Sequence, residues 1–241
     1  MGVRNETETR ALFVVTREMK KHNPDYTMHL GDVYYVGVLP ELEENCLGED
    51  KSGIQGVKLE LGTKGSFGLN GNHEMYACGT AYFDRFLPEL EPFDPSGKPE
   101  GQRASFFSLE NKYWKIVGLD TGYNSTGIRT VLSFLSRIKK VQWLRKISWF
   151  KPSCKLHDDL VKWLTKALPS DSGRGDKDSE TILPALILLS HHEYYSSFDD
   201  WYPIPAQQLR DHIPADRPVL WFWGMNTALE PTTAFRPTDA A

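Results

Sequence analysis

The sequence predicts an α/β fold, because segments with helical periodicity alternate with short apolar runs that have the features of strands. Residues 6–22 and 157–168 carry apolar side chains at helical spacing. Short apolar runs at 25–32, 66–71 and 184–192 end in glycine or polar residues, as strands do. The run "PALILLSHH" has no polar alternation, so both faces of that strand are expected to be covered.

The helix predicted over residues 6–22 has its dipole complemented at both ends. Glu6 and Glu8 stand in its first turn, and Lys20 and Lys21 stand in its last. The pair Asn23-Pro24 follows and cannot continue the helix. A strand over 25–32 is therefore expected to come next.

The remaining elements follow in chain order. Residues 39–65 are mixed in composition, contain glycines and show only a weak pattern, which predicts a long surface excursion. Residues 105–120 predict a hairpin that turns at Asn111-Lys112, and residues 219–224 predict a final strand. The polar stretch 170–180 is predicted to be a loop between the second helix and the strand at 184–192.

Composition and charge exclude several classes of protein. The chain has 241 residues with 40% hydrophobic and 25% charged residues, as an ordinary globular domain has. A net charge of -4 argues against a general nucleic-acid binder. No run approaches the ~18 apolar residues of a membrane span, so we expect a cytoplasmic protein without membrane partners. Three cysteines without a C-x-x-C pair indicate neither a disulfide framework nor a zinc knuckle.

Polar side chains gather where three predicted strands end. Asp32 follows the first strand, Asn72 and His73 follow the second, and His191 and His192 close the strand at 184–192. In open α/β sheets ligands bind beyond the carboxyl ends of the strands. Carboxylate, amide, imidazole and phenol groups suit iron, manganese or zinc. The sequence therefore predicts a metal site at these strand ends.

The strings "GDVYY", "GNHE" and "SHH", in that order at strand ends, resemble the calcineurin-like metallophosphoesterase family. Tyr35, three residues after Asp32, resembles the purple acid phosphatase-like variant. The resemblance implies a sandwich of two β-sheets flanked by helices (α-β-β-α). It also implies a dinuclear metal centre that hydrolyses phosphomonoesters or phosphodiesters, because two cations neutralise the phosphate oxygens and activate water.

The resemblance also implies a role for single residues. Asp32 matches the carboxylate that bridges both metals, Tyr35 matches a ligand of the first metal, and Asn72 and His191 match ligands of the second. His73 matches the catalytic histidine that donates a proton to the leaving group or stabilises charge on the phosphate.

Two neighbouring residues receive other predictions. His192 is expected to face the substrate or to support a ligand rather than to bind metal. Glu74 is expected to accept a hydrogen bond or to cap the helix that follows, and it is left out of the catalytic set. A turn or packing role remains an alternative for Asp32, Tyr35 and Asn72.

The chain departs from the family pattern at two motifs. The opening D-x-H is absent from the first residues, and Met225, Asn226 and Thr227 follow Gly224 in place of the closing G-H-x-H. We therefore expect residues 1–241 to form one phosphoesterase domain that is incomplete at both ends and holds at most one metal ion. A non-catalytic relative that binds a phosphorylated ligand or a partner, or a truncated product, is the alternative. The pattern indicates no oligomeric state.

Overall fold

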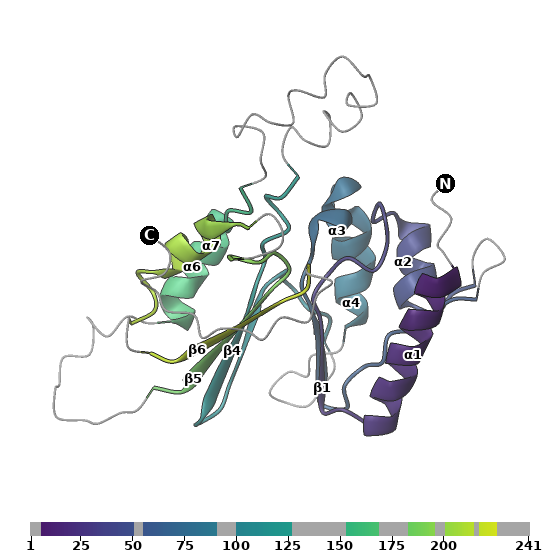
Figure 1. Cartoon of the computed structure of the whole chain (residues 1–241), viewed down its shortest axis with the longest axis horizontal. Coiled ribbons are helices and arrows are strands. Elements are labelled where there is room, and N and C mark those ends of the chain that lie inside the picture. The colour runs from purple at the N-terminus through teal and green to yellow at the C-terminus, as the bar shows by residue number, and fades with distance from the viewer. Residues whose placement is uncertain are drawn as a thin grey trace, which may run out of the picture. The chain divides into compact units, whose positions relative to one another are not determined.

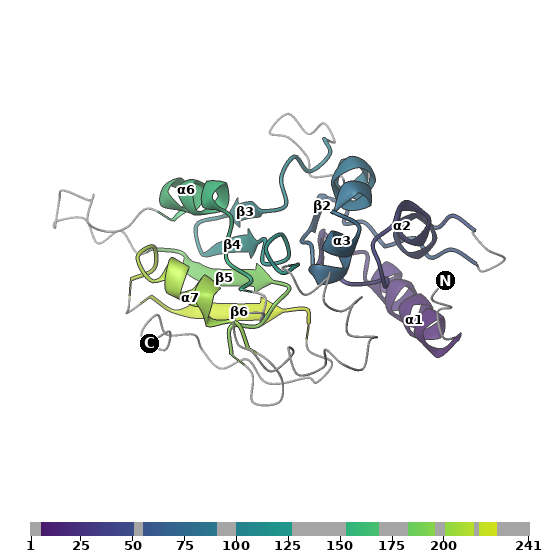
Figure 2. The same cartoon turned by 90° about the horizontal axis from the view of Figure 1, so that it is seen from above.

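The computed structural model of the protein describes residues 6–50, 55–90, 100–126, 153–168, 183–195, 201–214 and 217–225. The chain divides into two compact units, Met1–Ser105 (unit 1) and Phe106–Ala241 (unit 2). Unit 1 holds a two-stranded parallel sheet, and unit 2 holds a four-stranded mixed sheet (Figures 1 and 2). Helices accompany both sheets, so the predicted α/β class is confirmed. The single domain over residues 1–241 stays a prediction.

Unit 1 contains one long helix, several short ones and a parallel strand pair. Strand β1 pairs with β2 from Tyr26↔Gly65 to His29↔Gly68. Because the two strands are parallel, their carboxyl ends lie at the same edge. In chain order the elements are α1 (Glu6–His22), β1 (Tyr26–His29), α2 (Leu39–Cys46), β2 (Gly65–Gly68), α3 (Asn72–Tyr76), the π-helix η1 (Tyr82–Phe86) and α4 (Leu87–Glu89).

The prediction of a surface excursion over residues 39–65 was wrong for its first part. Residues Leu39–Cys46 form α2, with Pro40 in the first turn. Leu42 and Cys46 are fully or almost fully buried and pack with Tyr82 and Phe86 of η1. The apolar positions of this two-turn helix lie three and four residues apart, which is the signal that the mixed composition of the segment obscured.

Unit 2 is built around its four-stranded sheet, in the order β3-β4-β5-β6. Strand β3 is antiparallel to β4, whereas β4, β5 and β6 are parallel, so three carboxyl ends share one edge. The elements are β3 (Phe107–Glu110), β4 (Trp114–Leu119), α6 (Asp158–Ala167), β5 (Ala185–Ser190), α7 (Pro203–Leu209) and β6 (Val219–Trp223). The predicted loop over 170–180 lies outside the described residues.

The hairpin predicted over residues 105–120 is confirmed, as is its turn. The side-chain oxygen of Asn111 accepts hydrogen bonds from the backbone N–H groups of Tyr113 and Trp114, both at 2.8 Å. An asparagine that binds the backbone two and three residues ahead closes a turn by itself. Strands β3 and β4 then pair from Phe107↔Gly118 to Glu110↔Lys115.

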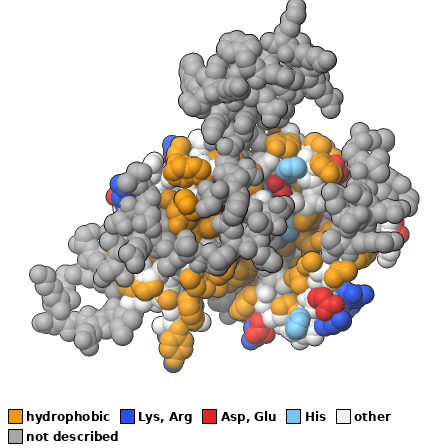
Figure 3. Space-filling model, viewed as in Figure 1, with side chains coloured by type: hydrophobic (Ala, Val, Ile, Leu, Met, Phe, Trp, Pro, Cys, Tyr) orange, Lys and Arg blue, Asp and Glu red, His pale blue; other side chains and the backbone are white. Residues whose placement is uncertain are grey.

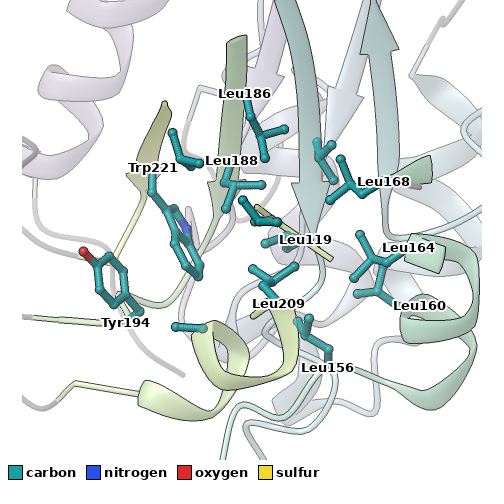
Figure 4. Close-up of a cluster of buried hydrophobic side chains, with 14 residues drawn as sticks. Leu119, Leu156, Leu160, Leu164, Leu168, Leu186, Leu188, Tyr194, Leu209 and Trp221 are labelled. Atoms are coloured by element: carbon teal, nitrogen blue, oxygen red, sulfur yellow. The ribbon is translucent and has the colours of Figure 1, made fainter. Parts of the chain in front are cut away.

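The core of unit 2 lies between one face of the sheet and the helices α6 and α7 (Figure 4). Along each strand every second side chain points to this face. Leu164 of α6, Leu209 of α7 and Trp221 of β6 are all at most 1% exposed. On β6, Leu220 and Phe222 alternate with the buried Val219 and Trp221, and their side chains are 36% and 41% exposed. The sheet therefore has one closed face and one face with accessible apolar side chains.

The described surface carries mixed charges. Exposed ion pairs join Lys21 to Glu18 and Lys64 to Asp25, both at 2.8 Å. On the face in Figure 3, blue and red side chains of the coloured residues stand beside one another at the lower right. Within the described ranges, no helix is both long and apolar enough to cross a membrane.

Candidate functional site

The predicted site residues of unit 1 meet at the carboxyl edge of the β1–β2 pair. Leu69 N donates to His29 O at 2.8 Å, which continues the parallel ladder one step past the strands. The chain then brings Asp32 to the start of α3, where the backbone N of His73 donates to Asp32 Oδ1 at 2.9 Å. Nε2 of His73 lies 3.8 Å from Asp32 Oδ2. The predicted convergence of these strand ends is therefore present in unit 1.

Asp32 has a strained backbone. Its φ of 60° lies in the left-handed region, and Gly31 before it has φ 94°. A residue other than glycine in this region costs on the order of 1–3 kcal/mol, and such strain gathers at functional sites. The sharp bend turns the Asp32 carboxylate back to the first turn of α3 rather than along the strand.

Glu74 holds this bend in place, as its predicted hydrogen-bonding role requires. The side chain is fully buried. Oε1 accepts from Asp32 N at 2.9 Å, and Oε2 accepts from Gly71 N at 2.7 Å. Burial, and next the charge of Glu74, raise the pKa of Tyr34 well above its ordinary value, so the phenol stays protonated and can donate to the carboxylate. One carboxylate thus joins the loops after β1 and β2.

A glycine lets the two loops approach each other. Gly37 has φ 73°, and a Cβ there would lie 2.5 Å from His73 O and 2.9 Å from Glu74 Cα. Any other side chain would force backbone apart at the first turn of α3. The segment from Asp32 to Gly37 is therefore packed directly against the candidate site.

Asn72 offers an oxygen that the fold does not use. Its Nδ2 donates to the hydroxyl of Tyr76 at 2.6 Å. Its Oδ1 is buried and has no hydrogen-bond partner among the described residues. A buried polar atom without a partner is costly, and a ligand that binds there removes the cost. The amide oxygen of Asn72 is thus an available donor for a cation at this edge.

Tyr35 lies at the outer side of this edge. Its side chain is 50% exposed, and its ring centroid lies 6.4 Å from that of His73. The predicted role of Tyr35 as a metal ligand stays a prediction.

The other two predicted site residues belong to unit 2. His191 and His192 follow β5 and are 0% and 2% exposed, with ring centroids 4.8 Å apart. His192 also packs edge-on against Tyr202. Both histidines lie at the carboxyl edge of β4, β5 and β6, where Met225 N donates to His191 O at 2.9 Å. That His191 binds the same metal as Asn72, and that His192 faces the substrate, stay predictions.

Thr121 positions His192, although its sequence position did not mark it as a site residue. The backbone N of His192 donates to Thr121 Oγ1 at 3.1 Å, and Nδ1 of the imidazole lies 3.1 Å from the same oxygen. Thr121 is completely buried. Its place directly after the buried carboxyl end of β4, next to the buried Asp120, was the available signal.

Replacing Thr121 with valine is expected to lower the free energy of unfolding by about 1–3 kcal/mol, because two buried polar groups of His192 lose their partner. Valine keeps the volume of threonine. Thr121→Ser, which keeps the hydroxyl, is the matched control and should retain the hydrogen bonds. Denaturant unfolding followed by circular dichroism measures both. Equal stability of Thr121→Val and the wild type would contradict the assignment.

The donor set of unit 1 fits part of a metal site. It provides one carboxylate, Asp32, and one amide oxygen, that of Asn72, which are ligands for hard and borderline cations. In the described part of the chain, no group of three or more His, Cys, Asp or Glu side chains lies close enough to hold a metal ion. Asparagine and tyrosine are not among these residue types.

Comparison of the chain with models of protein families, with curated proteins and with solved structures finds no match.

Proposed function

We propose that this chain is a metal-dependent phosphoesterase that binds at most one metal ion, iron, manganese or zinc, and hydrolyses phosphomonoesters or phosphodiesters. The observation that carries the proposal is the buried Oδ1 of Asn72, which has no hydrogen-bond partner within the described ranges, at the edge where the strained Asp32 also lies. The order of "GDVYY", "GNHE" and "SHH" along the chain supports the same reading.

Different residues would bind the metal ion and donate the proton. Asp32 and Asn72 would hold the ion from unit 1, with His191 as the further predicted ligand, whereas Tyr35 is the predicted ligand of the other metal of the family's dinuclear centre. When bound, such an ion offsets the negative charge of a phosphate ester and activates water as the nucleophile. His73, whose Nδ1 has no hydrogen-bond partner among the residues described, would protonate the leaving oxygen.

The proposal includes the α-β-β-α sandwich that the family resemblance implies. A two-sheet sandwich flanked by helices needs a sheet with helices on one face and an apolar second face. The β3–β6 sheet carries α6 and α7 on one face, and the accessible Leu220 and Phe222 lie on the other. This pattern favours the α-β-β-α arrangement.

A second candidate function is a non-catalytic relative that binds a phosphorylated ligand. The observation that favours it is the run from Gly224 to Thr227, where methionine and threonine stand at the positions of the closing histidines. A chain with fewer imidazoles would bind metal weakly, yet could keep a polar edge for an anion.

Elemental analysis of the full chain, loaded in turn with iron, manganese and zinc salts and then desalted, tests the proposal. We expect one equivalent of metal or less per chain, and we expect Asp32→Ala and Asn72→Ala each to remove it, because they delete the two ligands of unit 1. Asp84→Ala is the matched control, since Asp84 is an exposed carboxylate of η1. Hydrolysis of p-nitrophenyl phosphate should follow the metal content.

Two equivalents of metal that survive Asp32→Ala would overturn the proposal, as would a wild-type chain that binds none. Metal binding without hydrolysis, combined with saturable binding of phosphate, would favour the second candidate.

A further inference from the structure

Among the described residues, Tyr76 is the hydrogen-bond partner of the Asn72 amide. It stands four residues after Asn72, at the end of α3, so the two side chains lie on the same side of that short helix. Its hydroxyl accepts from Nδ2 of Asn72 at 2.6 Å. Its ring also packs against His73, with centroids 4.9 Å apart and planes tilted by 42°.

In the structure this hydrogen bond uses the Nδ2 end of the amide and leaves the oxygen end over. An asparagine side chain presents two N–H donors at one end and an oxygen at the other. With Nδ2 bound to Tyr76, the oxygen becomes the buried atom that has no partner in the described part of the chain. If the amide were turned over, its two N–H groups would occupy that place and would repel a cation.

The Tyr76 hydroxyl can accept this hydrogen bond because its own proton can be donated to solvent. The side chain is 40% exposed, so the hydroxyl can donate to solvent while it accepts from Asn72. Residues that orient a metal ligand through its second polar atom usually affect metal affinity about 10–100-fold when they are replaced.

We propose that Tyr76 is a positioning residue that keeps Oδ1 of Asn72 turned towards the metal. This inference rests on the proposed function, in which Asn72 is a ligand. It assigns Tyr76 no contact with the substrate and no part in proton transfer.

Isothermal titration of the full chain with Mn²⁺ tests the inference. Tyr76→Phe removes the hydroxyl and keeps the ring against His73, and we expect it to weaken binding about 10–100-fold. Tyr123→Phe is the matched control, because Tyr123 is a similarly exposed tyrosine of unit 2 that packs on His157. It should bind Mn²⁺ as the wild type does.

Repeating Tyr76→Phe in an Asn72→Asp protein separates an effect on the orientation of the amide from an effect on packing. In Asn72→Asp both side-chain oxygens are equivalent, so no amide has to be turned. Tyr76→Phe should therefore weaken Mn²⁺ binding in the asparagine background and leave it within about threefold in the aspartate background. A role in packing alone would weaken binding equally in both, and that result would overturn the inference.

The remaining outcomes tell the two proposals apart. If the wild type binds Mn²⁺, Asn72→Ala abolishes binding and Tyr76→Phe has no effect, the inference is wrong and the proposed function stands. If the wild type binds no Mn²⁺, or if Asn72→Ala binds it unchanged, the proposed function fails and the inference falls with it.

Discussion

Replacing Glu74 with alanine is expected to lower the free energy of unfolding by about 3–5 kcal/mol. The carboxylate is fully buried and accepts hydrogen bonds from Asp32 N and Gly71 N. Its loss would leave both N–H groups, and the buried phenol of Tyr34, without their acceptor. Each unsatisfied buried donor costs about 1–3 kcal/mol. Denaturant unfolding followed by circular dichroism measures the loss.

Two further variants sharpen this test. Glu74→Gln keeps the shape but turns an N–H donor towards one of the two backbone N–H groups, so we expect an intermediate loss of stability. Glu18→Ala is the control, because Glu18 is an exposed glutamate of α1 and surface substitutions usually change stability by less than about 0.5 kcal/mol. A Glu74→Ala protein as stable as Glu18→Ala would contradict the role given to Glu74.

Replacing His73 with alanine is expected to reduce phosphate-ester hydrolysis about 10²–10⁴-fold, the usual contribution of a general acid. Metal affinity should change little, because the contact of His73 with Asp32 Oδ1 uses the backbone N, which alanine retains. Steady-state hydrolysis of an alkyl phosphate, whose leaving group is strongly basic, together with titration of Mn²⁺, separates the two effects. This prediction rests on the proposed function.

The control for His73 is His22→Ala, since His22 is an exposed histidine at the end of α1. It should leave the rate unchanged. A leaving group of low basicity needs little protonation, so the loss at His73 should grow as the leaving group becomes more basic. A His73→Ala protein with a wild-type rate on alkyl phosphates would remove His73 from the catalytic set.

Several elements could be predicted from the sequence because their signals are local. The hairpin that turns at Asn111 and the strand β5 follow from turn chemistry and from the pattern of apolar residues over fewer than twenty positions. The helix α6, predicted over 157–168, begins one residue later at Asp158, with His157 as its N-cap. The short helices α2 and α7 were missed, because few apolar positions fit into two turns.

Local patterns were enough to place polar side chains at the strand ends: Asp32, Asn72, His73, His191 and His192 could be named from their position after apolar runs. The pairings that orient these side chains, in contrast, come from long-range contacts in the folded chain. Thr121 meets His192 across 71 residues, and Glu74 meets the backbone of Asp32 across 42. Such contacts depend on which strands lie side by side and on the exact path of each loop, and neither is encoded in a local period or spacing.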